Sequence, residues 1–282
     1  MRRVPRVALL HDLTGVGRCA MTVAAPALTR MGVEACPMPT AILSTHPAGF
    51  GPFHFRPLTD DLAAMLAHYQ REGLRFDGCY LGFVAEPGQV DVVAPFLAGQ
   101  TGAMTLLDPV MGDGGKLYRF FGEDIVPALR RAMGLARVAT PNLTEACLLL
   151  GLPYAPGPLP EDRAVEMARG LLRLGPEMAV ITSVPVAGRG PVNVAATASR
   201  AELIGYEALS PSLHGAGDLF AALLLARLIR GEGFFPAAAA ATAAATCAVA
   251  ATLEAGTPAR EGLLIQGMPA PWPERGMDLD PQ

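Results

Sequence analysis

The residues best suited to chemistry lie at 212–230, SLHGAGDLFAALLLARLIR. Gly215, Ala216 and Gly217 precede Asp218 and a long apolar run, which predicts a helix with a carboxylate in its first turn. Unpaired N–H groups and the helix dipole can bind a phosphate there when small side chains let it approach. An adjacent carboxylate would equip the turn to move a phosphoryl group onto a hydroxyl. A plain capping turn has the same pattern.

A second candidate segment, LLDPVMGDGGKLY at residues 106–118, places a carboxylate where an apolar strand is expected to end. Asp108 could act through water on a metal ion, and residues 113–115 could close over a nucleotide. A turn stabilised by an Asp side chain explains the same residues equally well.

A third segment, TPNLTEACLLLG at residues 140–151, has Asn142 at an expected helix N-cap and Glu145 in the first turn. This is the spacing of a capping box, in which each side chain accepts a hydrogen bond from the other residue's backbone N–H. The Glu145 carboxylate could instead hold a water ligand of Mg2+. Taken alone, these residues favour the capping role.

The hydrophobic pattern predicts strands that alternate with helices, and therefore a mainly parallel sheet with helices on both faces. The expected strands or buried apolar runs are 4–10, 35–43, 79–84, 103–107, 137–140 and 178–182, followed by a hairpin at 192–198 and 202–208. The expected helices are 19–31, 60–72, 90–97, 123–133, 144–150, 161–174 and the run within 212–230. A Gly-containing turn, HDLTGVGRC, is expected after the first strand.

Polar residues gather where the expected strands end, which is where ligands bind in such sheets. They are His11, Asp12 and Thr14 after the first strand, His46 after the second, Asp108 after the fourth, and Asn142 and Glu145 after the fifth. The segment STHPAGFGPFHF, within 44–57, lacks helical periodicity. We expect an ordered flap over a ligand, with a surface hairpin as the alternative.

Composition excludes several classes of protein. The chain of 282 residues is 51% hydrophobic, which predicts a globular fold with a large core. A net charge of -4 without a basic block argues against nucleic-acid binding. Lys116 is the single lysine among 22 basic residues, and Leu117 follows it in place of Ser or Thr, which excludes a Walker loop.

The cysteines and the apolar segments indicate the cellular compartment of the protein. The five cysteines are scattered and never form a CxxC pair, which predicts reduced core thiols in a cytosolic protein. The first apolar run is too short for a signal peptide. The Ala-rich segment 236–253 predicts a tightly packed buried helix rather than a membrane span.

Taken together and in their order along the chain, these segments resemble the motifs of the ribokinase-like superfamily. The resemblance is closer to its vitamin B6 branch of pyridoxal and pyridoxamine kinases. The resemblance covers nearly the whole chain through HDLTGVGRC, TAILSTHPAGF, LGFVAE, DPVMGDGGKLY, TPNLTEACLLLG, VITSV and HGAGDLFAALLLARLIRG. It implies one α/β domain over 1–282: a three-layer α/β/α sandwich with a flap at about 44–57 and a tail at 268–282. It also implies a cytoplasmic homodimer without nucleic-acid or membrane partners.

The activity that the resemblance implies is ATP-dependent phosphorylation of the 5'-hydroxymethyl group of pyridoxal, pyridoxamine or pyridoxine. Asp218 is then similar to the family's catalytic base, which accepts the hydroxyl proton. Gly215, Ala216 and Gly217 correspond to the anion hole at the transferring phosphate.

The same resemblance assigns the nucleotide and metal side. Asp108 and Glu145 are similar to the acidic pair that organises Mg2+, through water, and the ATP phosphates. Asn142 and Thr182 fall at nucleotide-side positions, and Asp113 with Lys116 lies in the loop that folds over ATP. Some B6 kinases have a Lys at the position of Thr182, so the charge there must come from Mg2+ or an arginine.

The acceptor ring is expected between the first loop and the flap, near Asp12, Thr14, His46 and Pro47. Many B6 kinases have Thr in place of Pro47, so one hydrogen bond to the ring is lost or comes from elsewhere. Many have GTGD or GVGD where this chain has GAGD, and Ala216 still presents its backbone N–H.

Two alternatives remain open. The first keeps the fold but changes the acceptor to hydroxymethylpyrimidine or a sugar; His46 and the flap aromatics favour a flat ring over a polyol. The second is a non-catalytic binder of a B6 vitamer or nucleotide, against which the base Asp218 argues. The remaining histidines show no metal-ligand spacing on one element, so we expect structural or solvent-facing roles for His11, His54, His68 and His214.

Overall fold

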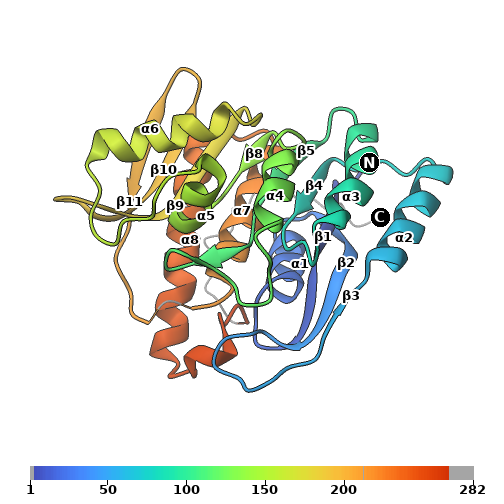
Figure 1. Ribbon diagram of the computed structural model, residues 1–282, viewed down its shortest axis with the longest axis horizontal. Coiled ribbons are helices and arrows are strands. Elements are labelled where there is room, and N and C mark those ends of the chain that lie inside the picture. Colours follow the sequence, from blue (N-terminus) through green and yellow to red (C-terminus); the bar gives the residue numbers. More distant parts are fainter. Residues whose placement is uncertain (1–2, 212, 267–282) are drawn as a thin grey trace, which may run out of the picture.

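The computed structural model describes residues 3–211 and 213–266; Ser212 and the expected tail at 268–282 lie outside the described residues. At its centre is a nine-stranded sheet with strand order β11-β10-β9-β8-β5-β4-β1-β2-β3 (Figure 1). Neighbours from β9 to β2 pair in parallel, and β3, β10 and β11 add antiparallel edges. The bounds are β1 Arg6–Val16, β2 Glu34–Thr45, β3 Phe55–Pro57, β4 Gly78–Leu81, β5 Met104–Leu107, β8 Val138–Ala139, β9 Met178–Val186, β10 Gly190–Thr197 and β11 Ala201–Gly205.

Helices cover both faces of the sheet (Figure 1). One core cluster joins the sheet to α1 (Met21–Arg30), α7 (Ala216–Ile229) and α8 (Phe234–Glu254). The other joins it to α2 (Thr59–Arg71), α3 (Gly88–Gly99), α4 (Ile125–Met133), α5 (Leu143–Leu150) and α6 (Glu161–Leu172). The predicted three-layer α/β/α sandwich with a mainly parallel sheet is confirmed.

Local sequence accounts for these layers. In α4, Ile125, Leu129 and Ala132 recur at helical spacing and are buried, while Arg130 is exposed. The β4 sequence GCYL is buried at every position, as expected of a strand covered on both faces. Polar side chains of these strands are therefore expected at the strand ends rather than on the covered faces, and in such sheets ligands bind at the carboxyl ends.

Strand β1 is longer than predicted. The expected turn after Leu10 is wrong, because the strand continues to Val16 and pairs with β2 as far as Thr45. Gly15, which suggested a turn, lies against the neighbouring strand; a Cβ there would be 3.0 Å from the Ser44 carbonyl oxygen. His11, Asp12 and Thr14 therefore lie within a strand.

Two further segments form hairpins. The flap consists of the end of β2, residues 46–54 and the antiparallel strand β3, so the alternative of a surface hairpin describes its backbone. In the second segment, β6 (Gly112–Asp113) and β7 (Lys116–Leu117) pair antiparallel around Gly114 and Gly115.

Helix α8 is packed on one face only. Residues such as Ala237, Ala241 and Ala248 are buried with α7 in the same core cluster, whereas Ala239 and Cys247 are exposed. The helix is long and apolar enough to span a membrane by length and composition, and 33% of its apolar window is buried. The prediction of a tightly packed buried helix is thus wrong for the outer face, and Cys247 is not a core thiol.

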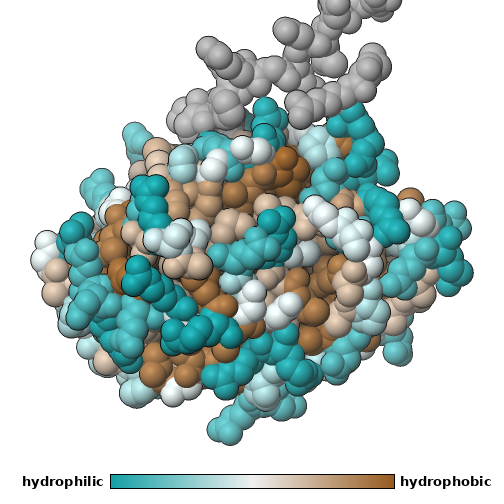
Figure 2. Space-filling view, turned by 90° about the horizontal axis from the view of Figure 1, so that it is seen from above, coloured by the Kyte–Doolittle hydropathy of each residue, from teal (hydrophilic) through white to brown (hydrophobic). Residues whose placement is uncertain are grey.

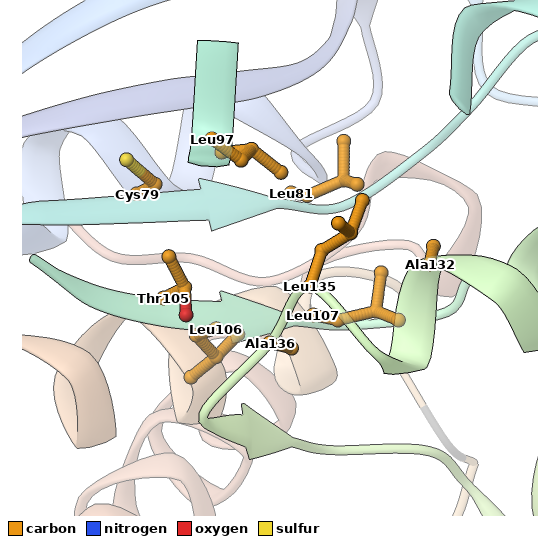
Figure 3. Close-up of a pocket in the computed structure, with 9 residues that line it drawn as sticks. All are labelled: Cys79, Leu81, Leu97, Thr105, Leu106, Leu107, Ala132, Leu135 and Ala136. Atoms are coloured by element: carbon orange, nitrogen blue, oxygen red, sulfur yellow. The ribbon is translucent and has the colours of Figure 1, made fainter. Parts of the chain in front are cut away.

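The surface and interior contain features that the site does not use. Figure 2 shows apolar patches separated by hydrophilic residues on one face of the molecule. Figure 3 shows a cavity beside β4 and β5 whose lining is apolar except for Thr105. Its lining residues are Cys79, Leu81, Leu97, Thr105, Leu106, Leu107, Ala132, Leu135 and Ala136.

Candidate active site

The start of α7 has the geometry that the glycines predict. Gly215 is its N-cap residue with φ 91°, and a Cβ there would lie 2.6 Å from the Arg18 carbonyl oxygen. Gly217 is exposed, and a Cβ there would meet nothing within 4 Å. The turn is therefore closely packed against Arg18 at Gly215 and open to solvent at Gly217. A ligand can approach the helix start at Gly217.

Asp218 lies in the first turn of α7, as predicted, with 12% of its side chain exposed. Its Oδ2 accepts a hydrogen bond of 2.6 Å from the Ala20 N–H. Burial alone would raise the pKa of the Asp218 carboxyl, but the neighbouring His11 and the Ala20 N–H outweigh burial and hold the pKa below its usual value. Asp218 is therefore ionised and able to accept a proton.

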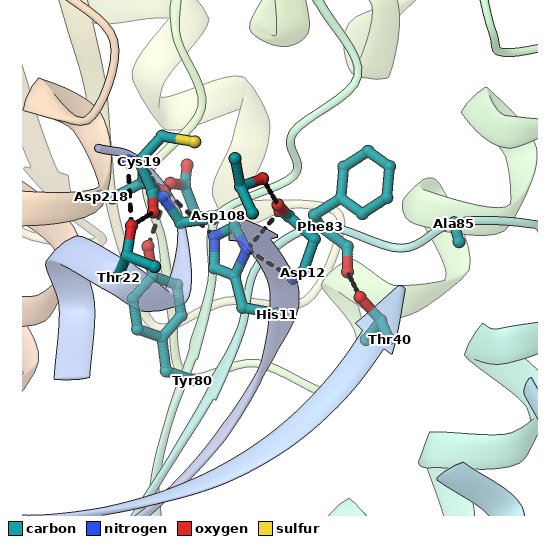
Figure 4. Close-up of polar contacts among 12 residues, drawn as sticks. His11, Asp12, Cys19, Thr22, Thr40, Tyr80, Phe83, Ala85, Asp108 and Asp218 are labelled. Atoms are coloured by element: carbon teal, nitrogen blue, oxygen red, sulfur yellow. Dashed lines mark hydrogen bonds and ion pairs between the residues drawn. The ribbon is translucent and has the colours of Figure 1, made fainter. Parts of the chain in front are cut away.

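His11 lies between Asp12 and Asp218 (Figure 4). Its Nδ1 is 2.9 Å from Asp12 Oδ1, and its Nε2 is 3.0 Å from Asp218 Oδ1. The His11 side chain is 2% exposed. Burial would lower the pKa of His11, but the two carboxylates raise it to about 10.

Asp108 follows β5 and is buried beside Tyr80, whose hydroxyl donates to its Oδ2 over 3.3 Å. Burial, followed by the negative charge of Asp218, raises the pKa of Asp108 to about 7. Figure 4 shows Asp108, Tyr80, His11 and Asp218 in one group at the carboxyl end of the sheet. A buried carboxyl whose pKa is raised by a neighbouring carboxylate is a candidate position for binding a cation.

We expect Asp108→Asn to change the pH dependence of folding. The folded-state pKa of Asp108, about 7, exceeds its ordinary 3.8, so the folded protein retains a proton that the unfolded chain loses. The unfolding free energy then decreases as pH rises towards 7 and levels off above it. Asparagine does not titrate, so the variant does not lose unfolding free energy in this way as pH rises. Its stability relative to wild type should be greater at about pH 8 than at about pH 5.

Urea unfolding without added Mg2+ measures this difference. Asp91→Asn, which changes an exposed carboxylate on α3, is the matched control and should show no such change with pH. A difference between Asp108→Asn and wild type that is the same at both pH values would contradict the assignment.

Asn142 and Glu145 form the predicted capping box at the start of α5. The Asn142 side chain accepts from the Glu145 N–H, and Glu145 Oε2 accepts from the Asn142 N–H, each over 2.9 Å. Glu145 Oε1 accepts from the Met111 N–H over 3.0 Å, so backbone groups bind both carboxylate oxygens. Burial and the charge of Asp108 raise the pKa of Glu145.

The other nucleotide-side residues surround this helix start. Asn142 Nδ2 donates to the Gly112 carbonyl over 2.9 Å, which joins α5 to the β6–β7 hairpin. Asp113 and Lys116 pair across that hairpin and are exposed. Thr182 of β9 bridges to Asn142 through the backbone. The five predicted residues other than Asp108, namely Asp113, Lys116, Asn142, Glu145 and Thr182, are thus brought together.

The predicted ring-binding residues make bonds within the protein. Thr14 donates its hydroxyl to Asp12 Oδ2 over 2.7 Å. His46 is buried; its Nδ1 accepts from the Ala48 N–H over 3.1 Å, and its Nε2 is 2.6 Å from the Arg260 carbonyl oxygen. Pro47 is exposed beside it. These bonds occupy both His46 nitrogens, and substrate contact by the four residues stays a prediction.

Aromatic side chains connect the flap to the β6–β7 hairpin. The ring of Phe55 lies 6.3 Å from Phe83 and 5.8 Å from Phe120, measured between centroids. Phe120 lies 4.6 Å from Phe121. This apolar wall, with Ala41, Leu43 and Ala85 in the same cluster, suits a flat ring more than a polyol.

A segment at residues 260–263 joins three parts of the site. The bonds are Arg18 N–H to the Glu261 carbonyl at 2.8 Å, Leu263 N–H to the His214 carbonyl at 2.9 Å, and His46 Nε2 with the Arg260 carbonyl at 2.6 Å. Arg18 also donates through Nε to the Leu263 carbonyl over 3.0 Å. The loop after β1, the flap and the start of α7 are therefore held by one segment.

Sequence reasoning placed His11 at the binding edge of the sheet but assigned no site role to His11, Tyr80 or Ala20. The expectation that His11 is structural or solvent-facing is incomplete, because the buried ring contacts Asp218. A His-Asp pair following a buried apolar run was a signal for it. No local signal marks the Ala20 N–H, because its bond to Asp218 depends on the packing of α1 beside α7.

Residues 26–261 match the family described as phosphomethylpyrimidine kinase. The chain is 32% identical over 245 residues to the pyridoxine/pyridoxal/pyridoxamine kinase of Bordetella avium, covering 79% of each chain. It is 29% identical over 237 residues to the pyridoxal kinase of Rubrobacter xylanophilus, again covering 79% of each.

Solved structures of similar proteins include pyridoxal kinases and putative phosphomethylpyrimidine kinases. A putative phosphomethylpyrimidine kinase from Bacteroides thetaiotaomicron, in a rhombohedral form, matches with a TM-score of 0.89 and 33% identity over 95% of this chain and 93% of that one. Its orthorhombic form, which contains pyridoxal, matches with a TM-score of 0.83 and 32% identity over 93% of each. The pyridoxal kinase from Lactobacillus plantarum matches with a TM-score of 0.86 and 32% identity over 94% of this chain and 95% of that one.

Together with these similarities, the α/β/α fold identifies the chain as a ribokinase-like kinase. Within this class, the chain belongs to the phosphomethylpyrimidine kinase family. The resemblance to pyridoxal and pyridoxamine kinases stated from the motifs is confirmed.

Proposed function

We propose that this protein transfers the terminal phosphoryl group of ATP to the 5'-hydroxymethyl group of a B6 vitamer: pyridoxal, pyridoxamine or pyridoxine. The observation that carries the proposal is Asp218, an ionised carboxylate at an open, glycine-flanked helix start in a chain of this family. The kinase names of the relatives and the pyridoxal found in the Bacteroides neighbour support it.

In the proposed reaction Asp218 accepts the hydroxyl proton as the oxygen attacks phosphorus. The backbone at Gly215, Ala216 and Gly217 stabilises the transferring phosphate through N–H groups and the helix dipole. The acceptor ring lies against the aromatic wall, near Asp12, Thr14, His46 and Pro47. Asp113, Lys116, Asn142 and Thr182 are proposed to contact the nucleotide.

Mg2+ fits the acidic groups near this site when its coordination includes water. No group of three possible ligands lies close enough to hold a metal ion directly among residues 3–211 and 213–266. Mg2+ usually keeps several waters and binds one or two carboxylates together with substrate phosphates. Asp108 would hold it on the protein side, and Glu145 would support the loop next to it because its oxygens bind backbone N–H groups. When bound, the ion neutralises phosphate charge.

Acceptor preference tests the proposal. ATP consumption with Mg2+ is measured with pyridoxal, pyridoxamine, pyridoxine, hydroxymethylpyrimidine and ribose. We expect turnover with at least one vitamer and about tenfold or more lower kcat/KM with ribose, because the aromatic wall offers few polar groups for a polyol. A clear preference for ribose would overturn the proposal. Binding of pyridoxal without any transfer would identify a non-catalytic binder.

Hydroxymethylpyrimidine is the second candidate acceptor. The match of residues 26–261 to the phosphomethylpyrimidine kinase family favours it, and a pyrimidine is also a flat ring. Higher kcat/KM for hydroxymethylpyrimidine than for every vitamer would favour this function. Assembly as a homodimer and a cytoplasmic location are further proposals, supported by the family resemblance.

A further inference from the structure

We propose that His11 is a positioning residue for the catalytic base, which it clamps by bridging Asp218 to Asp12. This inference rests on the proposed kinase function and adds a residue to it. Its basis is the placement of one imidazole between two carboxylates, 2.9 Å from Asp12 Oδ1 and 3.0 Å from Asp218 Oδ1.

The Asp218 carboxylate is held at both oxygens. The Ala20 N–H donates to Oδ2 over 2.6 Å, and His11 lies beside Oδ1. Among the described residues, His11 Nε2 has no partner with full hydrogen-bond geometry, so its contact with Asp218 is an ion pair rather than a linear hydrogen bond. A cation here restricts rotation of the carboxylate and stabilises its charge before the hydroxyl arrives.

His11 is itself held from several sides. Thr14 donates to Asp12 Oδ2 over 2.7 Å, which keeps the other Asp12 oxygen facing the ring. The Tyr80 ring packs edge-on against His11, with 5.6 Å between centroids. Gly82 makes room for the ring, because a Cβ at that position would lie 2.1 Å from His11 Cδ2.

The protonated ring fits its surroundings better than the neutral ring. A neutral ring with its proton on Nε2 could accept from the Asp12 backbone N–H at Nδ1 but would place that lone pair against the Asp12 carboxylate. A neutral ring with its proton on Nδ1 would place the Nε2 lone pair against Asp218. The protonated ring faces both carboxylates with an N–H group and gives up only the bond from the Asp12 N–H. The other titratable groups nearby are Tyr80 of β4, Asp108 after β5, Cys19 before α1 and His214 before α7. Asp108 adds negative charge to this group, which favours the imidazolium.

The test is His11→Asn, which removes the charge but retains a short polar side chain. We expect kcat to fall by about 10- to 100-fold, less than loss of the base itself, with nearly unchanged KM for vitamer and ATP. Without the cation the pKa of Asp218 rises, so the acidic limb of the kcat profile should move up by about one pH unit or more. The loss in kcat is therefore largest at low pH.

Two further variants separate this role from a purely structural one. Gly82→Ala displaces the ring without removing it and should shift the same limb in the same direction. His68→Asn, on the exposed face of α2, is the control and should leave kcat and its pH profile unchanged. A loss in His11→Asn that is equal at all pH values, or kcat within about twofold of wild type, would overturn the proposal.

Nitrogen NMR measures the protonation state of the His11 ring directly and does not depend on enzyme turnover. We expect both His11 nitrogens to carry protons at neutral pH in the wild type, and the pKa of His11 to fall in Asp218→Asn. A neutral wild-type ring would refute the clamp. A wild-type enzyme that phosphorylates no acceptor would instead refute the proposed function, so the two failures are distinguishable.

Discussion

Asp218→Asn is expected to lower kcat by about 100- to 10000-fold, the contribution typical of a general base. Asparagine has nearly the same shape and can still accept from the Ala20 N–H, but it cannot take the hydroxyl proton. ATP affinity should therefore change little, and any loss of unfolding free energy should come from the lost ion pair with His11. Steady-state kinetics, urea unfolding and nucleotide titration measure the three quantities separately.

Asp91→Asn is again a suitable control, because it removes an exposed carboxylate in α3 that pairs only with Arg131 among the described contacts. Its kcat should equal that of wild type. Turnover of Asp218→Asn within about tenfold of wild type would exclude Asp218 as the base and, with it, the proposed mechanism.

The two glycines at the start of α7 should differ in how the same added methyl group changes the free energy of unfolding. Gly215→Ala forces a side chain into the left-handed region, with its Cβ 2.6 Å from the Arg18 carbonyl oxygen. Arg18 cannot retreat easily, because its N–H is bonded to Glu261. We expect a loss of unfolding free energy of about 2 kcal/mol or more, and a large loss of kcat as Asp218 moves.

Gly217→Ala tests the ligand side of the same turn. The new methyl meets no protein atom within 4 Å, so stability should stay within about 0.5 kcal/mol of wild type. It would occupy the space through which a phosphate reaches the backbone, so kcat should fall by about tenfold or more. A fully active Gly217→Ala protein would show that no phosphate binds there. A Gly215→Ala protein as stable as wild type would show that an added Cβ at this position is not strained.

Local sequence predicted those parts of the site that local interactions form. The capping box of Asn142 and Glu145 and the position of Asp218 in the first turn of α7 follow from spacing within one turn of helix. The order of strands and helices followed from hydrophobic periodicity. The layers of the sandwich, and the meeting of polar residues at one edge of the sheet, followed from that order.

Contacts between distant segments could not be predicted in the same way. His11 meets Asp218 only because the fold brings the carboxyl half of β1 to the start of α7, and the length of β1 depends on its pairing with β2. Glycines give the same local signal in a turn and in a tightly packed strand, which is why Gly15 was misleading. The exposed face of α8 was missed because alanine suits both a packed and a solvated helix surface.

The segment at 260–263 has a consequence for how the enzyme is made. During translation, Arg18, His46 and His214 are synthesised before the backbone groups of residues 260–263 that join them. A nascent chain can therefore build most of its sheet during synthesis while its catalytic parts remain unconnected. We therefore expect a chain truncated before residue 260 to lack the bonds that join these three parts, even where its sheet has formed.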